Sequence, residues 1–464
     1  MTEITALSAP ELVESYRNRS LSPVEATEAV LAHIAAWEPK LGALYAFDPD
    51  GARAAARESE ARWLKGAPCG PLDGVPGTIK ENIATKGVPV PAGTAATKLV
   101  PAAEDAPPAA RLREAGMVIL AKTTMPDYGM LSSGLSSFHQ LARNPWDLRM
   151  NPGGSSAGAG SAGAAGYGPL HIGTDIGGSV RLPAGWCGLV GLKPSLGRIP
   201  INPPYVGRVA GPMTRTVADT ALMMSVLAKP DWRDGMSLPP AEIDWLAIDG
   251  QKLKGLRIGL MMEIGAGMAL AGDVRDAVQA AAKLFEAEGA IVEPVPAILT
   301  REMLDGLDDF WRARQWDDVE KLAPEDRAKI LPYIRAWAES GAERSGLQVV
   351  RGFNQTMVMR RAAAELFRGL DFVLSPTAPT ASYPADWASP VNDPEKPFEH
   401  IGYTVVWNMS EQPAVSVNCG FTAAGLPIGL QIVGSRFDDL GVLRMAKAYE
   451  DRRGAQRPWP QPPA

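Results

Sequence analysis

The sequence predicts an α/β fold, and three observations support this. A helical stretch near Ala106–Ala115 is stopped by Gly116 and followed by the apolar, strand-like run Met117–Ala121. Residues 256–295 alternate again: a strand over 256–262, a helix over 274–286 and a strand over 290–295. Three further apolar runs, at 372–375, 414–418 and 428–433, add strands near the C-terminus, and a helix follows Asp438.

Composition excludes several classes of protein. The 464 residues are 46% hydrophobic and carry a formal charge of −6, so no basic face for nucleic acid is expected. No apolar run reaches the roughly 18 residues of a membrane span, and the N-terminus lacks the apolar core of a signal peptide. Three scattered cysteines predict a cytoplasmic protein without disulfides. The histidine spacing predicts no metal site, and no cofactor is expected.

The N-terminal part is predicted to be helical. Ser8 with Glu11, and Ser22 with Glu25, form capping boxes that begin two helices, and a third helix covers about residues 49–65. Residues 71–82 then predict a turn and a short strand that directs Lys80 into the fold. The segment 123–130 follows a strand, where α/β sheets usually place ligand loops.

The stretch from Asn151 to Ser195 is rich in Gly, Ser and Ala, but apolar residues interrupt it, unlike in a flexible linker. Residues 157–166 are expected to form a helix of small residues that lets neighbouring backbone approach closely. The run Thr174–Ser179 is expected to form a tight turn whose amides converge on one point, with Ser179 at its rim. Such a point stabilises developing negative charge.

The C-terminal half contains a further expected capping box, Thr216 with Asp219, before a helix over 222–226. Residues 296–369 are mainly helical, with Leu304, Leu307 and Trp311 on one face. This region is either a packed layer or a lid that supplies an apolar pocket. Without a repeat or a clear linker, residues 1–464 are expected to form one domain: N-terminal helices over 1–66, a catalytic core over 67–230 and the rest of the sheet over 231–464.

Two short motifs are weak signals. Residues 158–163 match GxGxxG, but a dinucleotide site needs a preceding strand and an acidic residue about 20 positions later, and Pro152 and Pro183 stand there instead. Residues 154–158 match GxSxG, which would make Ser156 the nucleophile of an α/β-hydrolase. The strand expected before it is missing, and no downstream histidine lies in a suitable motif.

A serine activated by lysine fits better. Lys80 lies in a Gly- and Pro-rich segment, and Ser155 and Ser179 each follow a pair of glycines. Lysine acts as a base only where its pKa is lowered, which burial achieves by disfavouring the ammonium form. His171 lies between the two serine motifs and is interpreted as a hydrogen-bonded core residue.

These segments closely resemble the amidase signature family. The resemblance rests on three ordered motifs, at residues 71–83, 153–166 and 173–195, and on residues 411–416 with the strand after them. It implies a central mixed β-sheet surrounded by α-helices. By this resemblance Ser179 is the nucleophile, Ser155 is the bridging serine after a cis peptide bond, and Lys80 is the base.

The resemblance implies further roles around this triad. The backbone amides of Ile176, Gly177, Gly178 and Ser179 resemble the oxyanion hole. Asp175 and Arg181 are expected to orient this loop. Residues 128–132 would line the acyl pocket, with Tyr128, Gly129 and Met130 offering contact without charge.

The expected activity is therefore amide hydrolysis through an acyl-enzyme, with a preference for neutral, hydrophobic or aryl amides. Esters, anilides or carbamates would share the same chemistry. The expected protein is a monomer or homodimer that acts on a small-molecule amide, without nucleic acid or membrane. The alternative is the glutamine-hydrolysing A chain of a tRNA-dependent glutamine amidotransferase, which would need partner chains and tRNA.

Overall fold

The structure, a computed structural model, describes residues 3–463. Its strands are β1 (Leu44–Tyr45), β2 (Pro76–Lys80), β3 (Val118–Thr123), β4 (Leu170–Asp175), β5 (Val190–Lys193), β6 (Val209–Thr214), β7 (Arg257–Leu260), β8 (Ile291–Pro294), β9 (Phe372–Pro376), β10 (Ala414–Phe421) and β11 (Pro427–Gly434). They form one 11-stranded sheet in the order β1-β3-β2-β4-β6-β5-β10-β11-β9-β7-β8.

The sheet is mixed, as the sequence predicts. β2 runs parallel to both β3 and β4, whereas β6, β5, β10 and β11 pair with antiparallel neighbours. Parallel neighbours end at the same edge of a sheet, so Lys80 at the end of β2 and Asp175 at the end of β4 lie on one edge. This edge carries the site described below.

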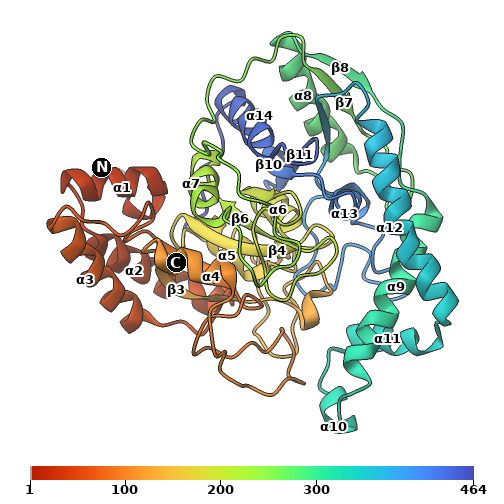
Figure 1. Cartoon of the computed structure of the whole chain (residues 1–464), viewed down its shortest axis with the longest axis horizontal. Helices are drawn as coiled ribbons and strands as arrows, with labels where there is room; N and C mark the ends of the chain where they lie inside the picture. Colours follow the sequence, from red (N-terminus) through yellow and green to blue (C-terminus); the bar gives the residue numbers. More distant parts are fainter. Residues whose placement is uncertain (1–2, 464) are drawn as a thin grey trace.

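Helices surround the sheet. They are α1 (Ala9–Asn18), α2 (Pro23–Leu41), α3 (Pro49–Leu64), α4 (Pro107–Glu114), α5 (Ala157–Ala165), α6 (Arg181–Cys187), α7 (Val217–Leu227), α8 (Gly272–Ala287), α9 (Arg301–Val319), α10 (Pro324–Arg327), α11 (Pro332–Glu339), α12 (Gly346–Leu366), α13 (Gly402–Met409) and α14 (Asp439–Arg452). The helices α1–α3 lie at one end of the molecule and α9–α12 at the other (Figure 1).

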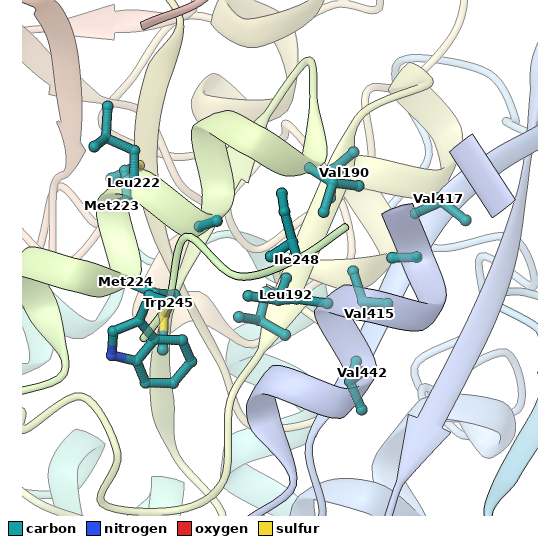
Figure 2. Close-up of a cluster of buried hydrophobic side chains, with 14 of the residues drawn as sticks. Val190, Leu192, Leu222, Met223, Met224, Trp245, Ile248, Val415, Val417 and Val442 are labelled. Carbon is teal, nitrogen blue, oxygen red and sulfur yellow. The ribbon is translucent and has the colours of Figure 1, made fainter. Parts of the chain in front are cut away.

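The largest core cluster lies where α7 and α14 pack near β5 and β10. Figure 2 shows Val190 and Leu192 from β5, Val415 from β10 and Val442 from α14 pointing into this cluster. A second apolar cluster joins α9, α11 and α12 to α13. Because this cluster borders the sheet edge that carries Lys80 and Asp175, side chains from α9 reach the site.

Several predictions of local structure are confirmed. Both N-terminal capping boxes form, with the Ser8 and Ser22 hydroxyls accepting from the amides of Glu11 and Glu25. The α5 helix is entirely buried, and a Cβ at Gly158 would lie 2.2 Å from the Ala43 carbonyl oxygen. The small residues therefore do allow close backbone approach, and residues 158–163 lie inside a helix instead of in a phosphate-binding turn.

Other predictions need correction. The helix expected over 222–226 begins earlier, at Val217, with Thr216 as its N-cap. Only half of the expected capping box forms: Thr216 Oγ1 accepts a hydrogen bond from the Asp219 amide. The Asp219 carboxylate does not return a bond to the Thr216 amide. It accepts instead from the Thr216 hydroxyl and from the Ala9 amide. Asp219 thus joins α7 to α1. The strands β4, β5 and β6 and the helices α6 and α13 were not predicted.

Candidate active site

Lys80 lies at the centre of a cluster of hydroxyl groups. Its side chain is fully buried at the end of β2. The amine Nζ lies 2.8 Å from Ser155 Oγ, 3.0 Å from Ser156 Oγ and 3.0 Å from Thr174 Oγ1. The structure therefore brings the predicted base and the predicted bridging serine into direct contact, and it adds two hydroxyls that the sequence reasoning did not assign.

Local structure explains how these hydroxyls converge. Ser155 follows a cis peptide bond from Gly154, and Ser156 is the N-cap of α5. Thr174 lies on β4, which pairs directly with β2. The register of the sheet places Thr174 beside Lys80, while the start of α5 brings both serines to the same point.

Burial lowers the pKa of Lys80 well below its usual range, because a desolvated ammonium is unfavourable. The nearby Arg208 lowers this pKa further, whereas Asp175 and Glu81 oppose the shift. The environment as a whole favours the neutral amine, which is the form that can act as a base.

A neutral amine has two hydrogens and one lone pair, so it cannot donate to all three hydroxyls. The Ser156 hydroxyl can donate to the Thr174 carbonyl at 3.2 Å, and the Thr174 hydroxyl can donate to Asn82 Oδ1 at 3.4 Å. Within residues 3–463, Ser155 Oγ has Lys80 as its hydrogen-bond partner and no other. In its neutral form, Lys80 can therefore accept the Ser155 proton on its lone pair while it donates to Ser156 and Thr174.

The turn after β4 is held by the Asp175 carboxylate. It accepts from the amides of Gly178 at 2.8 Å and Val180 at 3.1 Å, and from Nη2 of Arg181 at 3.0 Å. Burial alone would raise the pKa of Asp175, but Arg181 and the side chain of Asn408 outweigh it and hold that pKa well below its usual range. The ion pair thus fixes the conformation of the turn.

Arg181 anchors the same turn to distant parts of the chain. Its fully buried guanidinium donates to the Thr404 carbonyl, to Gln431 Oε1 at 2.8 Å and to Asn408 Oδ1 at 2.6 Å. The Thr404 hydroxyl also donates to the Gly177 carbonyl at 2.6 Å. The helix α13 and strand β11 therefore share control of the turn's position.

Four backbone amides of this turn were predicted to form an oxyanion hole, and the four differ in whether they have a hydrogen-bond acceptor. The Gly178 amide is already bonded to Asp175. Across the described residues, the amides of Ile176, Gly177 and Ser179 have no protein acceptor. Gly178 has a φ of +127°, and a Cβ there would lie 2.5 Å from Thr404 Oγ1, so this position requires glycine.

Ser179 lies at the mouth of the turn and is 9% exposed. Its carbonyl oxygen accepts from the Ser156 amide at 3.2 Å, which ties the turn to the segment that carries Ser155. Among residues 3–463, no hydrogen bond joins the Ser179 hydroxyl to Ser155, so the observed link between the two segments is this backbone contact.

Comparisons with known proteins identify the family of the chain. A model of the Amidase family matches residues 25–443. The chain belongs to the amidase signature family.

Individual relatives of this amidase-family chain differ in their named activities. The A chain of the glutamyl-tRNA(Gln) amidotransferase of Chloroflexus aggregans is 34% identical, and the match covers 97% of each chain. The solved structure of a bacterial aryl acylamidase is 29% identical, with a TM-score of 0.87 over 96% of each chain. That of 6-aminohexanoate cyclic dimer hydrolase is 26% identical, with a TM-score of 0.86 over 100% of this chain and 99% of the other. The first relative is one component of a complex, which bears on the expected monomer or homodimer.

A small pocket lies beside Ser179. The lining residues that the sequence predicted are Gly129, Met130, Leu131 and Ser132, with Ile176 and Gly177 of the turn; Tyr128 is not among them. The remaining lining residues come from distant segments and are Trp311, Ala388, Ser389, Pro397, Phe398, His400 and Ile401. Trp311 lies on the apolar face of α9 that the sequence predicted. The helical region 296–369 therefore supplies an apolar wall of this pocket.

The pocket is uncharged. No Asp, Glu, Lys or Arg of the described chain lines it. Burial lowers the pKa of His400 to about 3, so this imidazole is neutral at physiological pH. No motif marks residues 397–401, because their place beside Ser179 depends on how α13 packs on the turn.

Two further findings bear on the earlier expectations. His171 is a satisfied core residue: its Nδ1 lies 2.8 Å from Thr78 Oγ1 and its Nε2 lies 3.0 Å from the Gly168 carbonyl. Within residues 3–463, no helix has both the length and the apolar character needed to cross a membrane.

Proposed function

We propose that this protein hydrolyses neutral, hydrophobic or aryl carboxylic amides through an acyl-enzyme on Ser179. The observation that carries the proposal is the fully buried Lys80 amine, whose Nζ lies 2.8 Å from Ser155 Oγ. Because burial lowers the pKa of this amine, its neutral form can receive a proton from the neighbouring hydroxyl.

The first half of the reaction forms an ester. Ser179 Oγ attacks the amide carbonyl carbon as its proton passes to Ser155 Oγ, while Ser155 gives its own proton to Lys80. The carbonyl oxygen becomes an oxyanion, which the free amides of Ile176, Gly177 and Ser179 stabilise. One such donor typically lowers the barrier by about 3–4 kcal/mol.

The second half releases the products. The intermediate collapses as its C–N bond breaks, and Ser155 protonates the departing nitrogen and regains its proton from Lys80. A water molecule then takes the place of the amine and gives a proton to the same relay as it attacks the ester. Ser179 leaves with that proton, so the carboxylic acid is released and each group returns to its starting state.

The lining of the pocket supports neutral substrates. Trp311, Phe398 and Ile401 offer apolar surface, and the described lining holds no countercharge for a substrate carboxylate or ammonium. Burying an unpaired charge there would cost several kcal/mol. The same acyl chemistry extends to esters, anilides and carbamates.

Rates on paired substrates test this proposal. We expect kcat/KM for a neutral aryl amide to exceed that for glutamine and for malonamate, because only the neutral amide avoids an unpaired charge in the pocket. Faster turnover of the charged substrates would contradict the assignment of the substrate class.

The second candidate is the glutamine-hydrolysing component of a tRNA-dependent amidotransferase. It is favoured by the relative from Chloroflexus aggregans, at 34% identity over nearly the whole chain. Such a component would bind glutamine and release ammonia to partner chains. The purified single chain decides between the two candidates: full hydrolysis of neutral amides supports the first, and glutaminase activity that appears only with partner chains and tRNA supports the second.

A further inference from the structure

His400 holds a polar atom that the folded chain leaves unused. The residue is 1% exposed, and its Nε2 lies 2.7 Å from Ser132 Oγ. Its other ring nitrogen, Nδ1, is buried without a hydrogen-bond partner. A buried polar atom without a partner typically costs about 1–3 kcal/mol, so such an atom in a folded protein needs an explanation.

The position of His400 in the fold explains why its Nδ1 has no partner in the chain. Several other buried side-chain atoms of the described residues also lack partners, among them Thr27 Oγ1 and Trp37 Nε1. Of the residues that carry such atoms, His400 is the one that lines the pocket beside Ser179. Nδ1 itself has almost no accessible surface, so a molecule in the pocket can supply the missing partner by widening the pocket at this wall.

The imidazole is held rigidly in this place. Ser132 fixes one nitrogen, and the ring of Trp186 stacks on it with centroids 6.5 Å apart and planes at 29°. The Ser132 carbonyl in turn accepts a hydrogen bond from the Tyr383 hydroxyl. A group fixed in this way is preorganised, so a ligand that meets it does not have to order the side chain.

We propose that His400 Nδ1 is a specificity-determining contact that binds one neutral hydrogen-bonding group on an otherwise apolar substrate. The inference rests on the proposed function, because the ligand is a substrate of Ser179. A neutral imidazole forms one hydrogen bond at Nδ1, as donor or acceptor according to its tautomer. A hydroxyl group satisfies both tautomers, so a hydroxyaryl amide is the matching probe.

Binding to the Ser179→Ala variant tests the inference without turnover. Calorimetry would compare benzamide with its 2-, 3- and 4-hydroxy isomers. We expect one isomer to bind about 5- to 100-fold more tightly than benzamide, because it removes the penalty of the unpaired nitrogen. Benzamide binding as tightly as every isomer would overturn the inference and leave the proposed function intact, whereas no binding of any of the four would count against the proposed function itself.

Substitution of His400 then assigns the preference. In Ser179→Ala/His400→Phe, which keeps an aromatic ring beside Trp186, the preferred isomer should bind no more tightly than benzamide. The matched control is Ser179→Ala/Thr27→Val, which removes a buried unpaired hydroxyl from α2, outside the pocket. It should keep the preference. A preference that survives His400→Phe would contradict the assignment.

Discussion

Lys80→Met removes the amine that Ser155 contacts while keeping a side chain of similar length in the same buried space. Ser155 Oγ would lose the partner 2.8 Å away that accepts its proton. General-base catalysis typically contributes about 10²–10⁴-fold, so kcat/KM should fall by that factor, equivalent to about 3–5.5 kcal/mol. Steady-state rates on a neutral aryl amide measure this loss.

Two pH dependences accompany this substitution. The wild-type rate should rise with pH as Lys80 loses its proton and level off well below the usual lysine pKa, because burial lowers the pKa of Lys80. Stability should also rise with pH in the wild type relative to Lys80→Met. Between the folded-state and unfolded-state pKa values the unfolded chain binds a proton that the folded chain does not, so raising the pH favours folding.

Lys122→Met is the matched control. Lys122 lies on the neighbouring strand β3, is 2% exposed, and has a pKa lowered by burial to about 7. Its amine bonds to Thr85 Oγ1 and to the Ile83 carbonyl, away from the serines. The control should lose less than about tenfold in kcat/KM. If Lys80→Met kept activity within that limit, or if Lys122→Met lost as much, Lys80 would not be the base.

Three further substitutions test other parts of the structure. Gly129→Ala places a methyl group 3.3 Å from Ser155 Oγ, at a backbone φ of +70°. We therefore expect kcat to fall and the free energy of unfolding to drop by about 1–2 kcal/mol. Unchanged kinetics would refute the close packing. Arg181→Met leaves the Asp175 charge buried and unpaired and should cost about 3–5 kcal/mol in chemical denaturation, with partial recovery in the double variant that adds Asp175→Asn. Burial raises the pKa of Glu38 to about 7, so the folded state prefers the protonated form and stability declines as pH rises. Glu38→Gln should therefore gain about 2–3 kcal/mol relative to wild type between about pH 5 and about pH 8, and an equal effect at both pH values would contradict that shift.

Local signals in the sequence predicted much of the fold. Capping boxes and apolar periodicity depend on residues close in the chain, which is why α1, α2, α4 and α8 could be located. The strands β4 and β6 were missed because they are fully buried and interrupted by glycine or proline, so they show neither alternation nor a long apolar run.

The site was predicted unevenly for a related reason. Lys80, Ser155 and Ser179 stand in distinctive motifs, whereas Thr174 joins Lys80 through the pairing of β2 with β4, and Ser156 joins it through the position of the start of α5. The pocket wall at His400 comes from more than 200 residues beyond Ser179 in the sequence. Tertiary packing places it there, and no pattern in the sequence records that contact.

The central claim is that Ser179 is the nucleophile served by a buried amine. Reaction with a neutral aryl fluorophosphonate, followed by peptide mass spectrometry, tests it most directly. We expect one covalent adduct, on Ser179, with labelling abolished in Ser179→Ala and much slowed in Lys80→Met. An adduct on Ser155 or Ser156, or labelling at the wild-type rate in Lys80→Met, would contradict the account.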